Sequence, residues 1–524
     1  MAAVGFTALF FPKLGSTSTS QGSQSERAEL GRAIRDEGTK FAFRRRRVGH
    51  PTNGDIQGLP TVAVFSKALP HDSIGEVSQG NIRTLLRAIR TGSFSLLNRI
   101  NFGILRLANP EAAHAYSMQG ADSHQHRIPR APAFSSARVA GEMAEVYWQA
   151  LARDINFTDY STSTIISDAT TDLNSTFSDL DIPTAGGQIT SDTIFKGKLI
   201  GDDVGPYLSQ FLLQDRQVGS ITVSQRQRTV FPGYDHNSSE TDWLNLQNGQ
   251  KSFASEVFDP VPRYIRNGRD LAEYVQKDAS YQAYYFAIAP FLTLEPPPFG
   301  SGSYLFRQGH SDVFVNFGAA HIVNMLGEVA NLAFKAAWYQ KWSVHMRLRP
   351  EEFAGKIHQH LAGNANYPIN QEILNSPVLG RVIQQFGTAL MPLAYRDGCP
   401  THPSYPAGHA VVAGACVTLL KAVMDENFPI LNPVIPDSTG LNLLPYTGPD
   451  ANQLTLGSEL NKLASNIAIG RNWAGIHYRT DATAGLELGE EVTLRFLRET
   501  TDLYLENYSF SFTRFNGNTV TVRA

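Results

Sequence analysis

The sequence is poor in cysteine, in net charge and in long apolar runs. It contains two cysteines, Cys399 and Cys416, in 524 residues, which excludes a disulfide-rich scaffold and predicts free thiols. The formal net charge is −3, so the chain lacks the basic excess of a nucleic-acid-binding protein, and the arginines at 44–47 indicate a solvated or intersubunit arm. No apolar run approaches the roughly 18 residues of a membrane span, which predicts a soluble protein that is not transmembrane.

The N-terminal part differs in composition from the rest. Residues 1–16 hold an apolar patch without a preceding basic region, so we find no convincing secretory signal and leave the compartment unknown. Residues 15–27 are rich in Ser, Thr and Gln, which is typical of a flexible segment. We therefore expect residues 1–50 to form a flexible or oligomer-contacting arm, and residues 51–524 to form a single domain.

Helical periodicity dominates that domain. Residues 141–154 and 377–395 carry apolar side chains at helical spacing, and so do residues 322–336. Residues 161–262 are rich in Ser, Thr, Asp and Gly, which predicts long loops with a few short strands. Residues 510–522 predict a hairpin that turns at Asn516–Gly517. The fold class is therefore mainly α, with long loops and minor short β-strands.

Two cations lie near the end of the third periodic segment. Lys341 and Arg349 are eight positions apart, and Pro350 follows at once. A proline disfavours helical geometry in the preceding residue, so we expect Arg349 where a helix gives way to a loop. Trp338, Lys341 and His345 would share one helical stripe. Taken alone, the two cations are as well explained as solvated charges at a helix end.

A second segment, PSYPAGH at 403–409, precedes an apolar run of small residues. Pro406 and Gly408 open a predicted buried helix, whose free backbone N–H groups would form an anion site. His409 would lie in its first turn and could exchange a proton near neutral pH. The alternative is a core histidine that bonds a backbone carbonyl.

A third segment places Arg471 and His477 six residues apart, with Gly475 between them. The glycine predicts that the helix stops there, so that both side chains can converge on one point. Asp481, four residues after His477, could fix the imidazole tautomer. It could also cap a helix running from about residue 482 to 499.

The candidate set from the three segments is one lysine, two arginines, two histidines and a glycine-led helix start: Lys341, Arg349, Arg471, His409, His477 and Gly408. This set suits a tetrahedral oxyanion such as phosphate or vanadate. The motifs K-x7-RP, P-x-GH and R-x3-G-x-H-x3-D, with further similarity at 120–124 and 131–143, resemble those of the vanadium-dependent haloperoxidases, in the bromoperoxidase branch of algae and cyanobacteria. The resemblance covers about residues 50 to 510. It implies two four-helix bundles, with the oxyanion site in the C-terminal half at about 320–500, and a homo-oligomer.

The resemblance also implies roles for the residues. His477 resembles the axial ligand of vanadium in the vanadate cofactor, and His409 the residue that manages the protons of the apical hydroxide. Trp338 and His402 resemble positions that differ between bromide- and chloride-oxidising members, and the histidine favours bromide. The residues that would hold the vanadate oxygens are Lys341, Arg349, Arg471 and the backbone N–H of Gly408. Lys341 would also polarise the bound peroxide.

The implied reaction is the oxidation of bromide and iodide by hydrogen peroxide to hypohalous acid, which halogenates small organic acceptors. Two alternatives remain open from sequence. A soluble acid phosphatase could use the same cradle, with His477 as the nucleophile. An oxyanion-binding protein without turnover is the other, although simple binding would not need His409 and Lys341 together.

Two further features of the sequence bear on vanadate and metal binding. The family usually has serine where this chain has Ala407, which removes one hydroxyl donor and predicts weaker retention of vanadate. The H-x-H pairs at 124–126 and 358–360 have metal-ligand spacing, but no cysteine or carboxylate cluster at ligand spacing accompanies them, so we expect no metal there.

Overall fold

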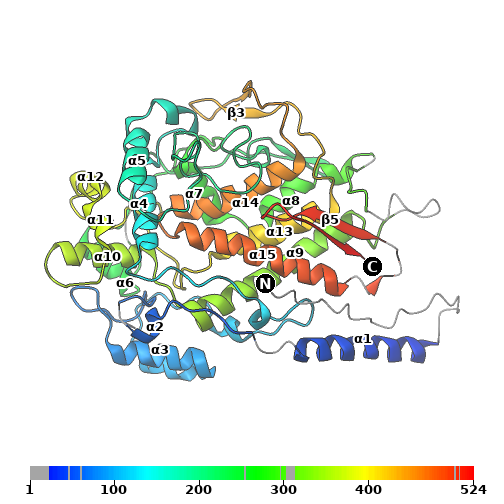
Figure 1. The fold of residues 1–524 in the computed structure, drawn as a ribbon, viewed down its shortest axis with the longest axis horizontal. Helices are drawn as coiled ribbons and strands as arrows, with labels where there is room; N and C mark the ends of the chain where they lie inside the picture. The colour runs from blue at the N-terminus through cyan, green and yellow to red at the C-terminus, as the bar shows by residue number, and fades with distance from the viewer. Residues whose placement is uncertain are drawn as a thin grey trace.

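The computed structural model describes residues 23–44, 48–58, 62–252, 255–295, 297–302, 313–500, 503–504, 506 and 508–523. The described part is mainly helical (Figure 1). The α-helices are α1 Gln24–Arg44, α2 Asp55–Gly58, α3 Gln79–Thr91, α4 Ala137–Ala152, α5 Thr164–Ser175, α6 Glu240–Gln247, α7 Gly268–Lys277, α8 Gln282–Ile288, α9 Ala319–Trp338, α10 Pro350–Leu361, α11 Gln371–Asn375, α12 Pro377–Phe386, α13 Gly408–Val423, α14 Leu456–Trp473 and α15 Arg479–Thr500. The strands form three antiparallel pairs, β1 Arg216–Val218 with β2 Ile221–Val223, β3 Val434–Pro436 with β4 Leu443–Pro445, and β5 Ser509–Thr513 with β6 Thr519–Arg523. The predicted fold class is confirmed.

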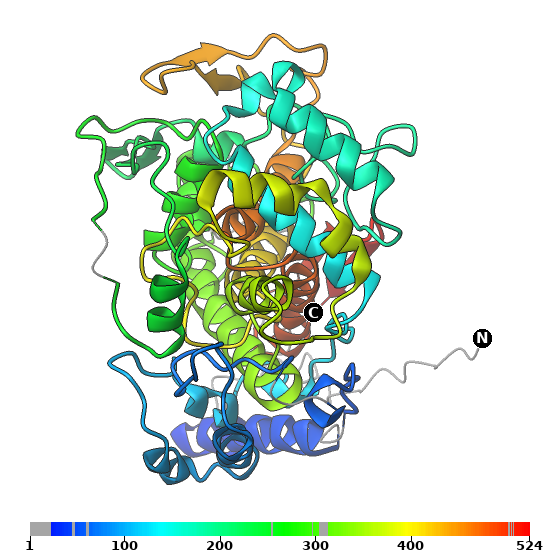
Figure 2. The same ribbon diagram turned by 90° about the vertical axis from the view of Figure 1, so that its left-hand side faces the viewer.

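Four helices, α9, α13, α14 and α15, pack together, and the site lies at their ends and in the segments that adjoin them (Figures 1 and 2). Helix α13 lies at the centre of this group, and all of its residues except His409 are buried. Helices α13 and α15 approach closely because glycines face each other's backbone. A Cβ at Gly414 would lie 2.2 Å from the Leu486 carbonyl oxygen, and one at Gly489 would lie 2.1 Å from that of Val411. Larger residues there would force the helices apart.

A second group combines segments that are distant in the sequence. Helices α4 and α5 pack against α11 and α12. Three of these helices begin at a serine whose hydroxyl accepts a backbone N–H of the first turn, at Ser136, Ser163 and Ser376. Helix α4 is almost entirely buried. It contacts α14, and Glu142 and Glu145 accept hydrogen bonds from the first turn of α15, so it links the two groups of helices.

The helix that carries Lys341 does not end as predicted. After Trp338 the chain continues into a seven-residue π-helix, η8, at Tyr339–His345, a form often found at functional sites. It stops at Met346, which has left-handed geometry with φ 48°. Arg349 is extended and opens α10, with Pro350 as the first helical residue. Arg349 therefore lies in a short extended segment after a helix end, as predicted, but it also caps a helix that was not predicted, because proline favours the first turn of a new helix.

Two further segments differ from the prediction, and a third confirms it. The helix predicted at 377–395 ends at Phe386, because Gly387 adopts a left-handed C-cap with φ 79°. The region 161–262 has the predicted loops and the short strands β1 and β2, but it also contains the helices α5 and α6, which were not predicted. The C-terminal hairpin is confirmed, with Thr513 paired to Thr519 and a turn that contains Gly517.

The N-terminal region has regular structure where it is described. Residues 24–44 form the helix α1, whose residues are mostly exposed, and which lies along the same side of the molecule as α3 (Figure 1). The apolar patch at 1–16 and most of the arginine run at 44–47 lie outside the described residues. Within the described part, no helix is both long and apolar enough to cross a membrane.

Candidate functional site

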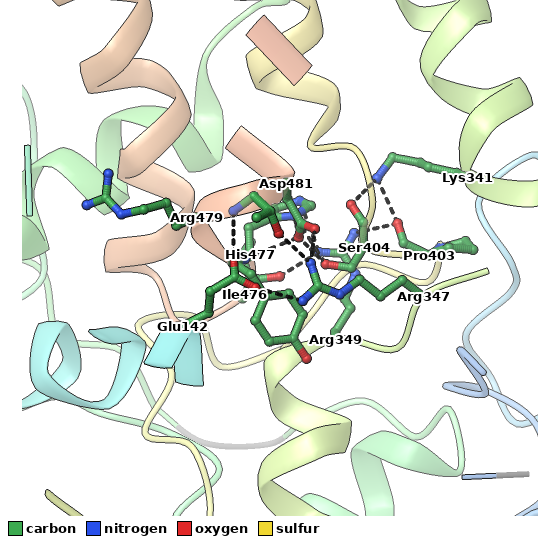
Figure 3. Close-up of polar contacts among 12 residues, drawn as sticks. Glu142, Lys341, Arg347, Arg349, Pro403, Ser404, Ile476, His477, Arg479 and Asp481 are labelled. Carbon is green, nitrogen blue, oxygen red and sulfur yellow. Dashed lines mark hydrogen bonds and ion pairs between the residues drawn. The ribbon is translucent and has the colours of Figure 1, made fainter. Parts of the chain in front are cut away.

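The three predicted segments converge on one point. Lys341 comes from η8, Arg349 from the start of α10, His409 from the first turn of α13, Arg471 from the end of α14, and His477 from the loop between α14 and α15. Figure 3 shows several of these side chains around His477 and Asp481. The structure therefore brings together residues that are up to 136 positions apart, from Lys341 to His477.

His477 is fixed by Asp481. Its Nδ1 atom lies 2.8 Å from Asp481 Oδ2, and both side chains are buried. Burial alone would raise the pKa of Asp481, but the Arg347 guanidinium and hydrogen bonds from His477 and Ser404 lower it, so the carboxylate stays ionised. An ionised carboxylate can only accept, hence Nδ1 carries the proton and Nε2 keeps its lone pair. Burial and the Arg349 guanidinium hold the pKa of His477 well below its usual range, so the ring is a neutral ligand.

The loop after Gly475, which has φ 81°, makes this arrangement possible. The predicted helix stop is confirmed, since α14 ends at Trp473. Helix α15 begins at Arg479 rather than near residue 482, so Asp481 lies in its first turn instead of at the cap position. Asp481 nevertheless accepts the Tyr478 backbone N–H at 3.1 Å, and it performs the orienting and the capping roles together.

Lys341 and Arg349 are held by backbone carbonyls. Lys341 Nζ donates to the Pro403 and Ser404 carbonyl oxygens, at 2.7 Å each. Arg349 donates to the carbonyls of His402 and Ile476, at 2.8 Å each, and its Nη1 lies 3.1 Å from His477 Nε2. Burial lowers the pKa of Lys341 and of Arg349, and repulsion from the Arg471 cation lowers both pKa values further.

Arg471 completes a cluster of positive charge. Its Nη1 donates to the Val275 carbonyl oxygen at 2.6 Å, and its buried Nε has no partner in the part of the chain that the structure describes. Within the described residues, no carboxylate lies within ion-pair distance of Lys341, Arg349 or Arg471. Three buried cations without a counter-ion are costly, and the unpartnered N–H shows where a donor remains for an anion. This donor set fits a multiply charged oxyanion.

His409 lies beside this cluster and is partly accessible. Its side chain is 30% exposed, and Nε2 lies 3.0 Å from Asp278 Oδ1. Burial and the Arg471 cation lower the pKa of His409, while the Asp278 carboxylate raises it. The core-histidine alternative does not describe this residue, because its hydrogen bond goes to a carboxylate.

The start of α13 offers backbone donors. Ala407 is the N-cap residue, with φ −68° and ψ 123°, and its methyl group makes no cap hydrogen bond. The first-turn N–H groups of Gly408 and His409 therefore remain available. A Cβ at Gly408 would lie 3.5 Å from the Trp338 ring, which is ordinary contact, so the lack of a side chain here leaves space without being sterically required.

Trp338 and His402 form an aromatic pair next to Arg349. Their ring centroids are 4.8 Å apart with an interplanar angle of 40°, and Trp338 Nε1 donates to the Ala108 carbonyl oxygen at 3.1 Å. His402 Nδ1 lies 3.1 Å from Arg349 Nη2. Burial and the nearby Lys341 and Arg349 cations hold the pKa of His402 well below its usual range, so this ring is neutral.

The other sequence candidates lie elsewhere. His345, predicted on the stripe of Lys341, packs edge-on against Tyr405 at 4.7 Å instead, because the π-helix changes the angular spacing. His124 pairs with Asp122, and His358 pairs with Glu240. Cys399 and Cys416 are buried free thiols, as predicted.

Sequence reasoning missed three residues of the site: Asp278, Ser404 and Arg347. Ser404 Oγ donates to Asp481, and Arg347 Nη1 donates to the same carboxylate at 2.9 Å. Ser404 and Arg347 stand inside the quoted motifs, so their position next to the cluster was an available signal. Asp278 lies at the C-cap of α7, 131 residues before His409, and no local pattern in the sequence connects the two.

Comparison with known proteins agrees with this geometry. Residues 326–504 match the family described as the VCPO second helical-bundle domain. The vanadium-dependent bromoperoxidase of Ascophyllum nodosum is 36% identical over 498 residues, covering 87% of this chain and 86% of that protein. The vanadium-dependent bromoperoxidase of Corallina officinalis is 34% identical over 561 residues, covering 90% of this chain and 92% of its own length.

A solved structure extends the agreement to the whole fold. The homohexameric second vanadate-dependent bromoperoxidase of Ascophyllum nodosum superposes with a TM-score of 0.89 at 27% identity, covering 98% of this chain and 94% of that one. The identity and coverage of the sequence relatives, the three motifs and the cation cluster around an oriented histidine agree. The chain belongs to the vanadium-dependent bromoperoxidase family.

Proposed function

We propose that this protein binds vanadate and oxidises bromide and iodide with hydrogen peroxide. The observation that carries the proposal is the buried cluster of Lys341, Arg349 and Arg471. It has no carboxylate counter-ion among the described residues, and Arg349 Nη1 lies 3.1 Å from the unprotonated Nε2 of His477. Hydrogen vanadate carries one to two negative charges, which the three fixed cations would offset without rearrangement.

Each residue has a place in this proposal. His477 Nε2 would bond the vanadium, and the three cations with the Gly408 N–H would hold the vanadate oxygens. Vanadate, when bound, supplies a Lewis acid that activates peroxide towards attack by halide. The planar forks of Arg349 and Arg471 match an oxyanion edge, whereas Lys341 is a point donor that can reach a single oxygen.

His409 would move the proton that peroxide releases. Its Nε2 faces Asp278, which leaves Nδ1 to accept a proton from the substrate side, and its partial exposure lets it exchange that proton with solvent. The overall reaction consumes hydrogen peroxide, one halide and one proton, and it yields hypohalous acid and water. The hypohalous acid would then halogenate small organic acceptors.

Bromination of a phenolic dye by metal-free protein, with bromide and peroxide, tests the proposal before and after orthovanadate is added. We expect activity only with vanadate, and suppression by competing phosphate. The phosphatase alternative is not favoured, because the relatives that match along the chain are bromoperoxidases. Phosphomonoester hydrolysis that vanadate inhibits, without any bromination, would overturn the proposal in favour of that alternative.

We also propose that the protein assembles as a homo-oligomer. Its structural relative is homohexameric and covers nearly the whole chain, and helix α1 presents the exposed apolar side chains of Leu30 and Ile34 on one face. Light scattering coupled to size-exclusion chromatography measures the assembly directly. A monomeric mass at micromolar concentration would contradict the oligomer.

A further inference from the structure

The carboxylate that orients His477 is itself held by a buried arginine. Asp481 Oδ2 receives His477 Nδ1 and the Tyr478 backbone N–H, while Oδ1 receives Arg347 Nη1 at 2.9 Å. The Asp481 side chain has no exposed surface and that of Arg347 is 4% exposed. An aspartate buried in this way depends on such a cation to stay ionised.

Arg347 is anchored in turn by helix α4. Its Nη2 donates to Glu142 Oε2 at 2.9 Å, and its guanidinium lies 3.8 Å from the centroid of the Tyr478 ring. Glu142 also accepts the Thr480 backbone N–H at 2.6 Å. Figure 3 shows Glu142, Arg347, Asp481 and His477 in one connected set of polar contacts.

We propose that Arg347 and Glu142 are positioning residues that set the orientation of His477 through Asp481. This inference rests on the proposed function, in which His477 Nε2 is the vanadium ligand. The contacts form one chain from Glu142 through Arg347 and Asp481 to His477, so helix α4 and the 347 position fix a ligand that neither touches. Arginine suits the middle of this chain because its planar fork bonds two carboxylates at once, which lysine cannot do.

A second buried arginine–glutamate ion pair on helix α4 provides a matched control. Arg479 Nε donates to Glu145 Oε2 at 2.8 Å, three residues along α4 from Glu142. The side chains of Arg479 and Glu145 are 4% and 1% exposed, against 4% and 3% for Arg347 and Glu142. Arg479 points away from His477 (Figure 3) and donates to the Lys196 carbonyl oxygen instead. The control pair therefore joins α4 to α15 without contacting Asp481.

The test is calorimetric titration of metal-free protein with orthovanadate. The test variants are Arg347→Lys and Glu142→Gln, and the controls are Arg479→Lys and Glu145→Gln. Loss of a partner that orients a metal ligand typically weakens affinity by about 10- to 100-fold. We expect that loss in both test variants, and a change of less than about threefold in both controls. Thermal unfolding midpoints of the metal-free proteins should fall by similar amounts in the two sets.

The outcomes separate this inference from the function on which it rests. Vanadate binding by the unsubstituted protein, with unchanged affinity in Arg347→Lys and Glu142→Gln, would overturn the inference alone. Equal weakening in the control variants would also overturn it, because the effect would then be one of general stability. Absence of vanadate binding by the unsubstituted protein would overturn the proposed function, and this inference with it. If Arg347→Lys fails to fold, the comparison of Glu142→Gln with Glu145→Gln decides the question.

Discussion

His409 and Asp278 form a hydrogen-bonded pair, with Nε2 3.0 Å from Oδ1, across the gap between the first turn of α13 and the end of α7. The carboxylate raises the pKa of His409 against the lowering effects of burial and of the Arg471 and Lys341 cations. Asp278 therefore tunes the group that we propose as the proton acceptor, and its removal has a predictable sign.

We expect Asp278→Asn to move the acid limb of the bromination profile to lower pH. His409 must be neutral to accept a proton, and loss of the carboxylate lowers its pKa further, so the active form survives to lower pH. The measurement is kcat/KM for hydrogen peroxide across pH 4 to 8. Glu273→Gln is the control, since Glu273 lies on the same helix and pairs with Lys277. An acid limb that moves upward, or one that moves equally in the control, would contradict this assignment.

Ala407→Ser should tighten vanadate binding. Ala407 is buried at the N-cap of α13 and has the extended backbone of a cap residue, so a serine hydroxyl there could bond an oxyanion oxygen. A hydrogen bond to a charged group is worth about 1.5–3 kcal/mol, or roughly 10- to 150-fold in affinity. Titration of the metal-free protein with vanadate measures the change. Ala407→Cys adds similar volume with a weak donor and should bind as the unsubstituted protein does. Equal affinities for Ser and Ala at 407 would rule the explanation out.

Local sequence patterns predicted which residues belong to the site, but they did not predict how the backbone and the helices arrange those residues. The motifs located Lys341, Arg349, His409, Arg471 and His477, because each stands in a short, ordered segment of unusual composition. The π-helix at 339–345 was not predictable, since five-residue hydrogen-bond spacing leaves no mark in apolar periodicity. Pro350 was ambiguous for the same local reason, because a proline both ends helices and begins them. The Asp278 contact depends on how α7 packs on α14, which only the tertiary fold determines.

Bromide and iodide should be oxidised much faster than chloride. His402 is neutral, packs at a tilt against Trp338 and lies 3.1 Å from Arg349, so it places an uncharged aromatic ring beside the proposed oxyanion site. Initial rates with the three halides near pH 7 test this expectation. His402→Ala should change the bromide-to-chloride ratio more than His360→Ala, which alters a ring remote from the cluster. A chloride rate equal to the bromide rate would refute it.

Stability should fall as the pH drops from about 6.5 towards 4. Burial lowers the pKa of His71 and His126 to about 4 and that of His345 to about 3, against about 6.5 in an unfolded chain. Between these pKa values the unfolded state binds more protons than the folded state. Each buried histidine therefore lowers the free energy of unfolding by about 1.4 kcal/mol for each pH unit of acidification, and its full contribution to stability is present above pH 6.5. Burial raises the pKa of Asp202 to about 6, so its effect on stability has the opposite sign and offsets roughly that of one histidine.

Urea unfolding midpoints at pH 7 and pH 5 should differ less in His126→Gln than in the unsubstituted protein. An unchanged difference in His126→Gln would show that this buried ring does not titrate on unfolding.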